Sequence, residues 1–290
     1  MNNDIYYIKY EKMYAGWLNR VLFRYNIVDI GQCKHLVQIN RKVINKKVYE
    51  KIIKITKNNK ILFSNNVVSN QYNNFFSGKL LMKYMIIDII KSMQQMIGSN
   101  FIQEDLYIAF CKEVDYNILS DLSKEFKSIN IITDKIRKIK RIESKLERDN
   151  IAYSISNNKK KALKKAKILI NMDYSSNFFE EFYINRNCII INLNPQNLLM
   201  KNSFQGSIIE RIEIDYINNN EYLDPMEYDK NKLYESYIIY NKYIDTRIIQ
   251  KQDKCIIKTL LGSSTKLSPK ELKNNFIKSS IKLDKNKKKD

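Results

Sequence analysis

Residues 129–173 read INIITDKIRKIKRIESKLERDNIAYSISNNKKKALKKAKILINMD, and their pattern decides the fold class. Short isoleucine-rich runs (INIIT, IAYSI and ILINM) alternate with two charged stretches of helical period. In the longer charged stretch, Ile136, Ile139, Ile142 and Leu146 form one apolar stripe. Apolar strands separated by helices are typical of a parallel sheet that helices cover on both faces.

The alternation continues on both sides of this segment. LYIAFC (residues 106–111) precedes it and CIIINLN (residues 188–194) follows it, each as an apolar run next to a helical stretch. The sequence therefore predicts an α/β fold with a five-stranded, Rossmann-like, doubly wound parallel sheet over about residues 105–195.

Further parts are expected around this sheet. Residues 1–76 are predicted to form a small N-terminal α/β domain, because HLVQINRKVI and KILFSNNVV are strand-like and KKVYEKIIKI is helical between them. Residues 77–197 would hold a connecting helix and the Rossmann-like domain, and residues 198–280 a C-terminal α+β extension. The lysine-rich residues 281–290 are predicted to be a disordered basic tail.

Composition limits the function classes. The chain has 290 residues, 44% of them hydrophobic, and a net charge of +20, which indicates a folded protein with a preference for anionic partners. The four cysteines are far apart and the one histidine, His35, has no further ligands near it in sequence, so no metal site is predicted. The N-terminus has no signal-peptide pattern, and Lys83 and Asp88 interrupt the most apolar helical stretch. A cytoplasmic location without membrane contact is therefore expected.

Half of the net charge lies between Lys135 and Lys167, where thirteen Lys/Arg face three Asp/Glu. One interpretation is the solvated face of a short helix whose buried side is Ala162, Leu163 and Ala166. The other is contact with the phosphates of RNA or DNA. In both cases we expect five lysines of the short helix to face water: Lys159, Lys160, Lys161, Lys164 and Lys165.

A resemblance to a known family is carried by KKALKKAKILINMD and the following NRNCIIINLNP. They resemble the fourth and fifth strands of shikimate dehydrogenases and glutamyl-tRNA reductases. Ala166, Ile170 and Asn171 match the first pattern of that family, and Asn194 and Pro195 approximate the second. The resemblance implies a small N-terminal domain, a long connecting helix, an NAD(P)-binding Rossmann domain and dehydrogenase-like chemistry.

The chain departs from this family in the turn after the first strand. That turn reads CKEVDYN, whereas the family places a glycine-rich turn there so that the backbone can approach a pyrophosphate. The sequence contexts of the family's catalytic residues are absent too, so no catalytic residue is assigned. The sequence therefore predicts a degenerate NAD(P)-binding protein with weak or lost catalysis. Two alternatives stay open, a nucleic-acid-binding protein and a structural or interaction protein without a ligand.

Candidate cofactor-binding residues lie where the predicted strands end, because ligands of open α/β sheets bind at the carboxyl edge. Asp134 ends the second strand, where an acid often holds a ribose hydroxyl, and the alternative is that it simply caps the next helix. The basic residues after it suit a 2′-phosphate. The residues predicted to contact NAD(P) or another small nucleotide are Lys112, Asn117, Asp134, Lys135, Arg137, Asn157, Asn158, Asn171 and Asp173.

Overall fold

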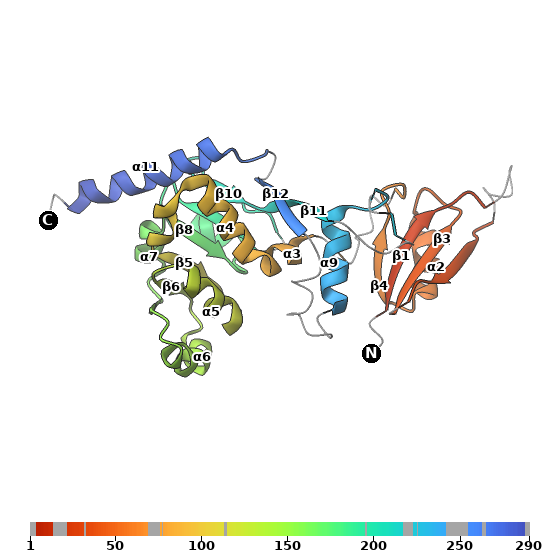
Figure 1. Cartoon of the computed structure of the whole chain (residues 1–290), viewed down its shortest axis with the longest axis horizontal. Coiled ribbons are helices and arrows are strands. Elements are labelled where there is room, and N and C mark those ends of the chain that lie inside the picture. Colours follow the sequence, from red (N-terminus) through yellow and green to blue (C-terminus); the bar gives the residue numbers. More distant parts are fainter. Residues whose placement is uncertain are drawn as a thin grey trace. The chain divides into compact units, whose positions relative to one another are not determined.

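The computed structural model describes residues 4–13, 22–31, 33–68, 76, 78–112, 115–194, 196–216, 223–224, 226–241, 255–262 and 265–287. The chain forms two compact units (Figure 1). Unit 1 comprises residues 1–81 and 214–256, and unit 2 comprises residues 82–213 and 257–290. The extension expected over residues 198–280 is therefore divided between the two units and is not a separate part.

Unit 1 contains a four-stranded sheet in the order β2-β3-β1-β4. β1 (Ile5–Tyr10) pairs in parallel with β3 (Lys34–Ile39) and β4 (Lys60–Phe63), and β2 (Tyr25–Asp29) is antiparallel to β3. Helix α2 (Lys46–Ile55) begins at Asn45, whose side chain accepts a hydrogen bond from the Val48 N–H. Its buried side chains pack on this sheet, as the strand–helix–strand pattern predicts.

Four further elements lie outside this four-stranded sheet. α9 spans Lys230–Asn241, and the buried Tyr7 hydroxyl of β1 hydrogen-bonds the Ser236 hydroxyl of this helix at 3.0 Å. β11 (Arg211–Tyr216) and β12 (Cys255–Leu261) form a two-stranded sheet. The short helix α3 spans Lys79–Tyr84.

Unit 2 is built on a six-stranded sheet in the order β10-β9-β8-β5-β6-β7, and every neighbouring pair is parallel. The strands are β5 (Leu106–Ala109), β6 (Ile129–Ile132), β7 (Tyr153–Ser156), β8 (Ile168–Asn171), β9 (Ile189–Asn192) and β10 (Ser207–Ile209). Counted along the chain of this unit, the order is 3-2-1-4-5-6 read from β7, which is that of the dinucleotide-binding Rossmann fold. The predicted Rossmann-like, doubly wound α/β fold is confirmed.

The sixth strand is the main difference from the expected sheet. Residues 208–217 (IIERIEIDYI) read as one strand, but the structure divides them at Glu210 into β10 and β11, which belong to different sheets. The buried Glu210 side chain accepts a hydrogen bond from the Leu198 N–H at 2.7 Å, and its own N–H donates to the Leu261 carbonyl. These contacts hold a charged residue at the junction and end the first strand there.

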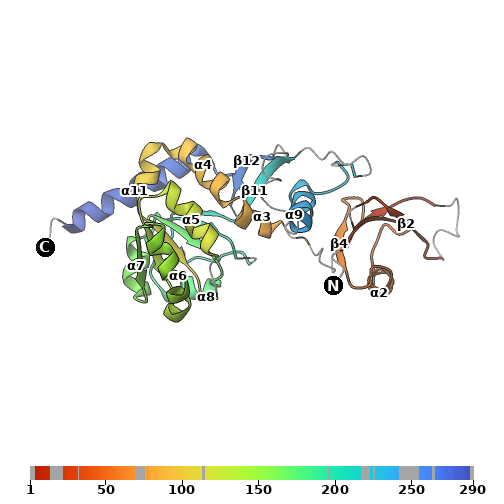
Figure 2. The same ribbon diagram turned by 60° about the horizontal axis from the view of Figure 1, so that its bottom comes forward.

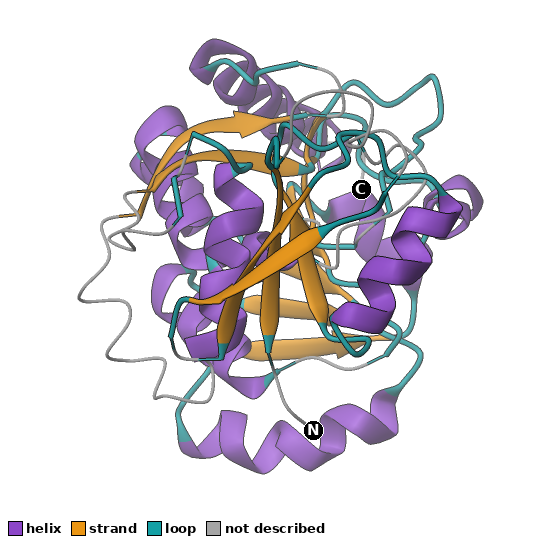
Figure 3. Ribbon diagram, turned by 90° about the vertical axis from the view of Figure 1, so that its right-hand side faces the viewer, coloured by secondary structure: helices purple, strands orange, loops and turns teal. Residues whose placement is uncertain are grey.

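Helices connect the strands of this sheet, and Figure 3 colours helices and strands separately. α7 (Lys159–Lys165) and α8 (Ser176–Glu181) bury Ala162, Leu163 and Phe178 against Tyr107 and Ala109 of β5. α5 (Tyr116–Glu125) and α6 (Ile136–Arg148) connect β5 to β6 and β6 to β7, and lie beside each other (Figure 2). Right-handed crossovers place these two helices on the opposite face from α7, because the chain reverses direction across the sheet after β7.

The remaining helices of unit 2 are α4 (Ile86–Ile97), a 3-10 turn at Ser99–Gln103 and α11 (Pro269–Lys287). α11 follows Ser268, whose hydroxyl accepts a hydrogen bond from the Glu271 N–H at 3.2 Å, in the S-P-K-E sequence of a capping box. The helix continues to Lys287, so most of the segment expected to be a disordered tail from residue 281 is helical.

Candidate functional site

The carboxyl edge of the six-stranded sheet brings the candidate residues together. The chain runs outward from β5 in one direction and from β8 in the other, so these two adjacent strands form the topological switch point. Ligands of open α/β sheets bind in the crevice at this point, outside the carboxyl ends of the strands. The residues that follow β5 and β8 therefore define the candidate site.

A carboxylate bridges the switch point. Asp173, two residues after β8, accepts hydrogen bonds from the backbone N–H groups of Cys111 at 2.6 Å and Lys112 at 2.7 Å. Cys111 and Lys112 form the turn after β5, which in dinucleotide-binding domains presents its N–H groups to a pyrophosphate. In this chain the anionic group that accepts these N–H groups is the carboxylate of Asp173. Burial and the nearby Asp173 raise the pKa of the Cys111 thiol, which disfavours the nucleophilic thiolate.

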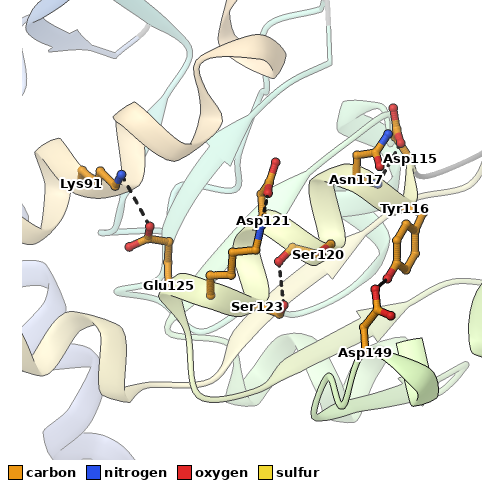
Figure 4. Close-up of polar contacts among 10 residues, drawn as sticks. Lys91, Asp115, Tyr116, Asn117, Ser120, Asp121, Ser123, Glu125 and Asp149 are labelled. Atoms are coloured by element: carbon orange, nitrogen blue, oxygen red, sulfur yellow. Dashed lines mark hydrogen bonds and ion pairs between the residues drawn. The ribbon is translucent and has the colours of Figure 1, made fainter. Parts of the chain in front are cut away.

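The beginning of the following helix is capped by a second carboxylate. Asp115 is the N-cap of α5, and its side chain accepts a hydrogen bond from the Asn117 N–H at 2.9 Å (Figure 4). The Asn117 side chain is exposed. Aspartate side chains thus accept hydrogen bonds from three described N–H groups of this region, those of Cys111, Lys112 and Asn117.

Asp134, which follows β6, forms an ion pair with Lys159, the first residue of α7, at 2.5 Å. The Lys159 ammonium also lies 5.7, 5.4 and 5.2 Å from the ring centroids of Tyr174, Phe178 and Phe182, within cation–π range. Its side chain is only 16% exposed. The expectation that all five lysines of this helix face water is therefore wrong for Lys159 and confirmed for the other four.

The other predicted residues on this side of the sheet have local roles or are exposed. Lys135 and Arg137 are exposed at the start of α6, and the Lys135 N–H donates to the Thr133 hydroxyl at 3.0 Å. Asn158 caps α7 by accepting a hydrogen bond from the Lys161 N–H. Asn157 is exposed beside it.

Three buried asparagines hold the loops after β8 and β9. The Asn171 amide donates to the Tyr174 carbonyl and to the Asn192 side-chain oxygen, both at 2.9 Å, and accepts from the Tyr174 N–H at 3.0 Å. Asn194 donates to the same Tyr174 carbonyl at 2.9 Å. Asn171 is fully buried, so its amide positions the loop that carries Asp173 and is not available to a ligand.

Sequence reasoning missed the contributions of Lys159 and Tyr174. Tyr174 is buried and stacks on Phe178, with ring centroids 3.8 Å apart. Burial raises the pKa of Tyr174, and the neighbouring carboxylates Asp134 and Asp173 contribute to this shift. The signal in the sequence was the run of aromatic residues at 174, 178, 179 and 182, directly after a strand end.

The described residues contain no group of three or more His, Cys, Asp or Glu side chains placed to hold a metal ion. His35 stacks on Tyr6, with ring centroids 4.8 Å apart, and its Nε2 lies 3.9 Å from an Asp4 carboxylate oxygen. Within the described part of the chain, no helix combines the length and hydrophobicity that a membrane span requires.

The basic segment between Lys135 and Lys167 is divided by the sheet. Its arginines and lysines lie partly on α6 and partly on α7, which cover opposite faces. Lys167 forms an ion pair with Glu104 at 2.6 Å. The basic residues that follow one another in sequence are therefore carried by two different helices.

Comparison with known proteins gives no family assignment. No family model matches the chain, and no curated protein matches it. Among solved structures it is similar to ornithine carbamoyltransferase from Pyrococcus furiosus, at 9% identity and a TM-score of 0.26, over 67% of this chain and 73% of that one. A second match is to a protein from Trypanosoma cruzi assigned as an aspartate carbamoyltransferase, at 10% identity and a TM-score of 0.23, over 68% of this chain and 60% of that one.

These matches correct the resemblance inferred from the sequence. The resemblance to shikimate dehydrogenases and glutamyl-tRNA reductases is wrong, since the similar structures are carbamoyltransferases. The short patterns behind it, around Ala166, Asn171 and Asn194, are explained by packing and by the buried asparagine network. Both TM-scores are too low to define a shared fold, so the fold assignment rests on the strand order of the sheet.

Proposed function

We propose that unit 2 is a Rossmann domain of the dinucleotide-binding type that has lost tight NAD(P) binding, and with it dehydrogenase catalysis. The observation that carries this proposal is the Asp173 carboxylate on the backbone amides of Cys111 and Lys112. The strand order supports the ancestry of the domain, because it is the order of dinucleotide-binding sheets. The Asp173 carboxylate in the turn after β5 supports the loss of tight NAD(P) binding.

Charge repulsion opposes a dinucleotide in the usual pose. A pyrophosphate in the turn after β5 would meet the carboxylates of Asp173 and Asp115, and it would have to displace the first from two charge-assisted hydrogen bonds. Asp134, which would hold a ribose hydroxyl, is already paired with Lys159. The exposed cations at this edge, Lys112, Lys135 and Arg137, still attract an anionic nucleotide. We therefore propose weak nucleotide binding in an altered pose.

Thermal shift measurements with NADH and NADPH test this proposal. We expect 1 mM of either cofactor to stabilise the protein by less than about 0.4 kcal/mol, which corresponds to a dissociation constant of roughly 1 mM or weaker. Stabilisation by about 2.7 kcal/mol, the value for a ligand at 100 times its dissociation constant, would contradict the proposal. AMP and ADP at the same concentration separate an effect of the nicotinamide half from a general effect of anions.

Nucleic-acid binding through α7 stays a prediction from the sequence. Lys160, Lys161, Lys164 and Lys165 are exposed on this helix. Four exposed lysines of α2 in unit 1 provide a control with the same change of net charge: Lys46, Lys47, Lys51 and Lys54.

We expect reversal of either set of lysines to glutamate to lower affinity for single-stranded RNA equally, within about threefold, because a solvated face contributes only through net charge. Fluorescence anisotropy at two salt concentrations measures both variants. A loss about tenfold larger for the α7 variant, with a salt dependence of several phosphate contacts, would support nucleic-acid binding instead.

A further inference from the structure

The carboxylate of Asp173 has the position and contacts of a bound anion. Its two oxygens each accept one backbone N–H, from Cys111 at 2.6 Å and from Lys112 at 2.7 Å. Asp173 does not belong to the same local turn, since more than sixty positions separate it from Cys111 and Lys112 in sequence. Two adjacent N–H groups that converge on one anion form a concave backbone site of the kind that binds phosphate.

Two further polar groups lie near this edge of the sheet. The hydroxyl of Tyr174 is buried, and the carboxylates of Asp134 and Asp173 both raise its pKa. The Lys159 ammonium is paired with Asp134 and lies over the Tyr174 ring at 5.7 Å from its centroid. The backbone pair and the Tyr174 hydroxyl would together suit an anion with several oxygens.

We propose that the turn after β5 is a latent diphosphate site in which Asp173 acts as an internal anion, and that inorganic pyrophosphate or the diphosphate of a nucleotide occupies the turn when Asp173 is neutralised or removed. The inference rests on the proposed function, because it explains how tight dinucleotide binding was lost. In the occupied state the N–H groups of Cys111 and Lys112 donate to the phosphate oxygens, and the Tyr174 hydroxyl donates to the same group.

The test uses the full chain and inorganic pyrophosphate as the probe. Asp173→Ala frees both N–H groups, and Asp173→Asn removes the charge while keeping the shape of the side chain. We expect each variant to bind pyrophosphate at least about tenfold more tightly than the parent by isothermal titration calorimetry, since each removes a repulsive charge from the turn. In ¹⁵N-labelled protein, pyrophosphate should shift the amide resonances of Cys111 and Lys112.

Asp121→Ala is the matched control, because it removes one negative charge from an exposed position on α5, where Asp121 pairs with Lys124, without freeing the amides of the turn. Unchanged pyrophosphate affinity in folded Asp173→Asn, or an equal gain in Asp121→Ala, would overturn the inference. Asp173→Asn decides the test where Asp173→Ala does not fold. The result is independent of the cofactor measurement, because tight NADPH binding by the parent protein contradicts the proposed function whatever pyrophosphate does in the variants.

Discussion

Replacing Gly206 with alanine should destabilise unit 2 strongly. A Cβ at this position would lie 2.0 Å from the backbone oxygen of Cys188 and 2.5 Å from the Phe204 ring. Gly206 immediately precedes β10, and Cys188 immediately precedes β9, so the clash falls between two neighbouring strands of the sheet. A ring can rotate, but a backbone oxygen moves only if the strands separate. We expect a loss of at least about 3 kcal/mol in the free energy of unfolding.

Gly262→Ala is the control for this prediction. The nearest atom to a Cβ at Gly262 is the Ile208 backbone oxygen at 3.4 Å, which is an ordinary contact. We expect this variant to change the unfolding free energy by less than about 1 kcal/mol, and the gain from a less flexible unfolded chain acts in its favour. Urea unfolding followed by circular dichroism measures both. Similar stabilities for the two variants would show that β10 can move away from β9 at little cost.

Five of the six strands of the unit 2 sheet were predictable, because each of them is a separate apolar run in the sequence. Four isoleucine-rich strands between β6 and β9 are separated by helices of clear period, and a parallel sheet is the arrangement that buries such strands on both faces. The sixth strand was missed because its three residues run directly into β11. What divides them is the buried Glu210, whose hydrogen bond to the Leu198 N–H is not visible in a local sequence pattern.

The candidate site was predictable only as a location. The topology of a parallel sheet places Asp134, Asn171 and Asp173 at its carboxyl edge, and the structure has them there. Their partners depend on contacts between distant segments, so the hydrogen bonds of Asp173 could not be predicted from spacing. Lys159 was misjudged for a similar reason. A lysine within a run of lysines is expected to face water. The rings next to the Lys159 ammonium belong to Tyr174, Phe178 and Phe182, which lie in the loop before α8, in α8 and at its C-terminal end.

A second large loss of stability is expected from a substitution in the buried asparagine network. Asn171→Asp keeps the size of the side chain but replaces its amide donor with a carboxylate oxygen. That oxygen would face the Tyr174 carbonyl and the Asn192 side-chain oxygen, each 2.9 Å from the present amide nitrogen. A charge buried against two acceptors is strongly unfavourable. We expect the variant to lose about 3 kcal/mol or more of unfolding free energy at pH 8.

The loss should depend on pH in a defined direction. Burial and the two acceptors raise the folded-state pKa of the introduced carboxyl above its unfolded value of about 3.9, because only the protonated form can donate a hydrogen bond to them. The variant is therefore closest to the parent below the unfolded pKa, and its deficit grows as the pH rises through the folded pKa. Urea unfolding of both proteins at pH 5 and pH 8 measures the difference. Asn157→Asp, at an exposed position on the same edge, should stay within about 0.5 kcal/mol of the parent at both pH values. A deficit in Asn171→Asp that is equal at both pH values would mean that lost hydrogen bonds, and not the buried charge, cause the destabilisation.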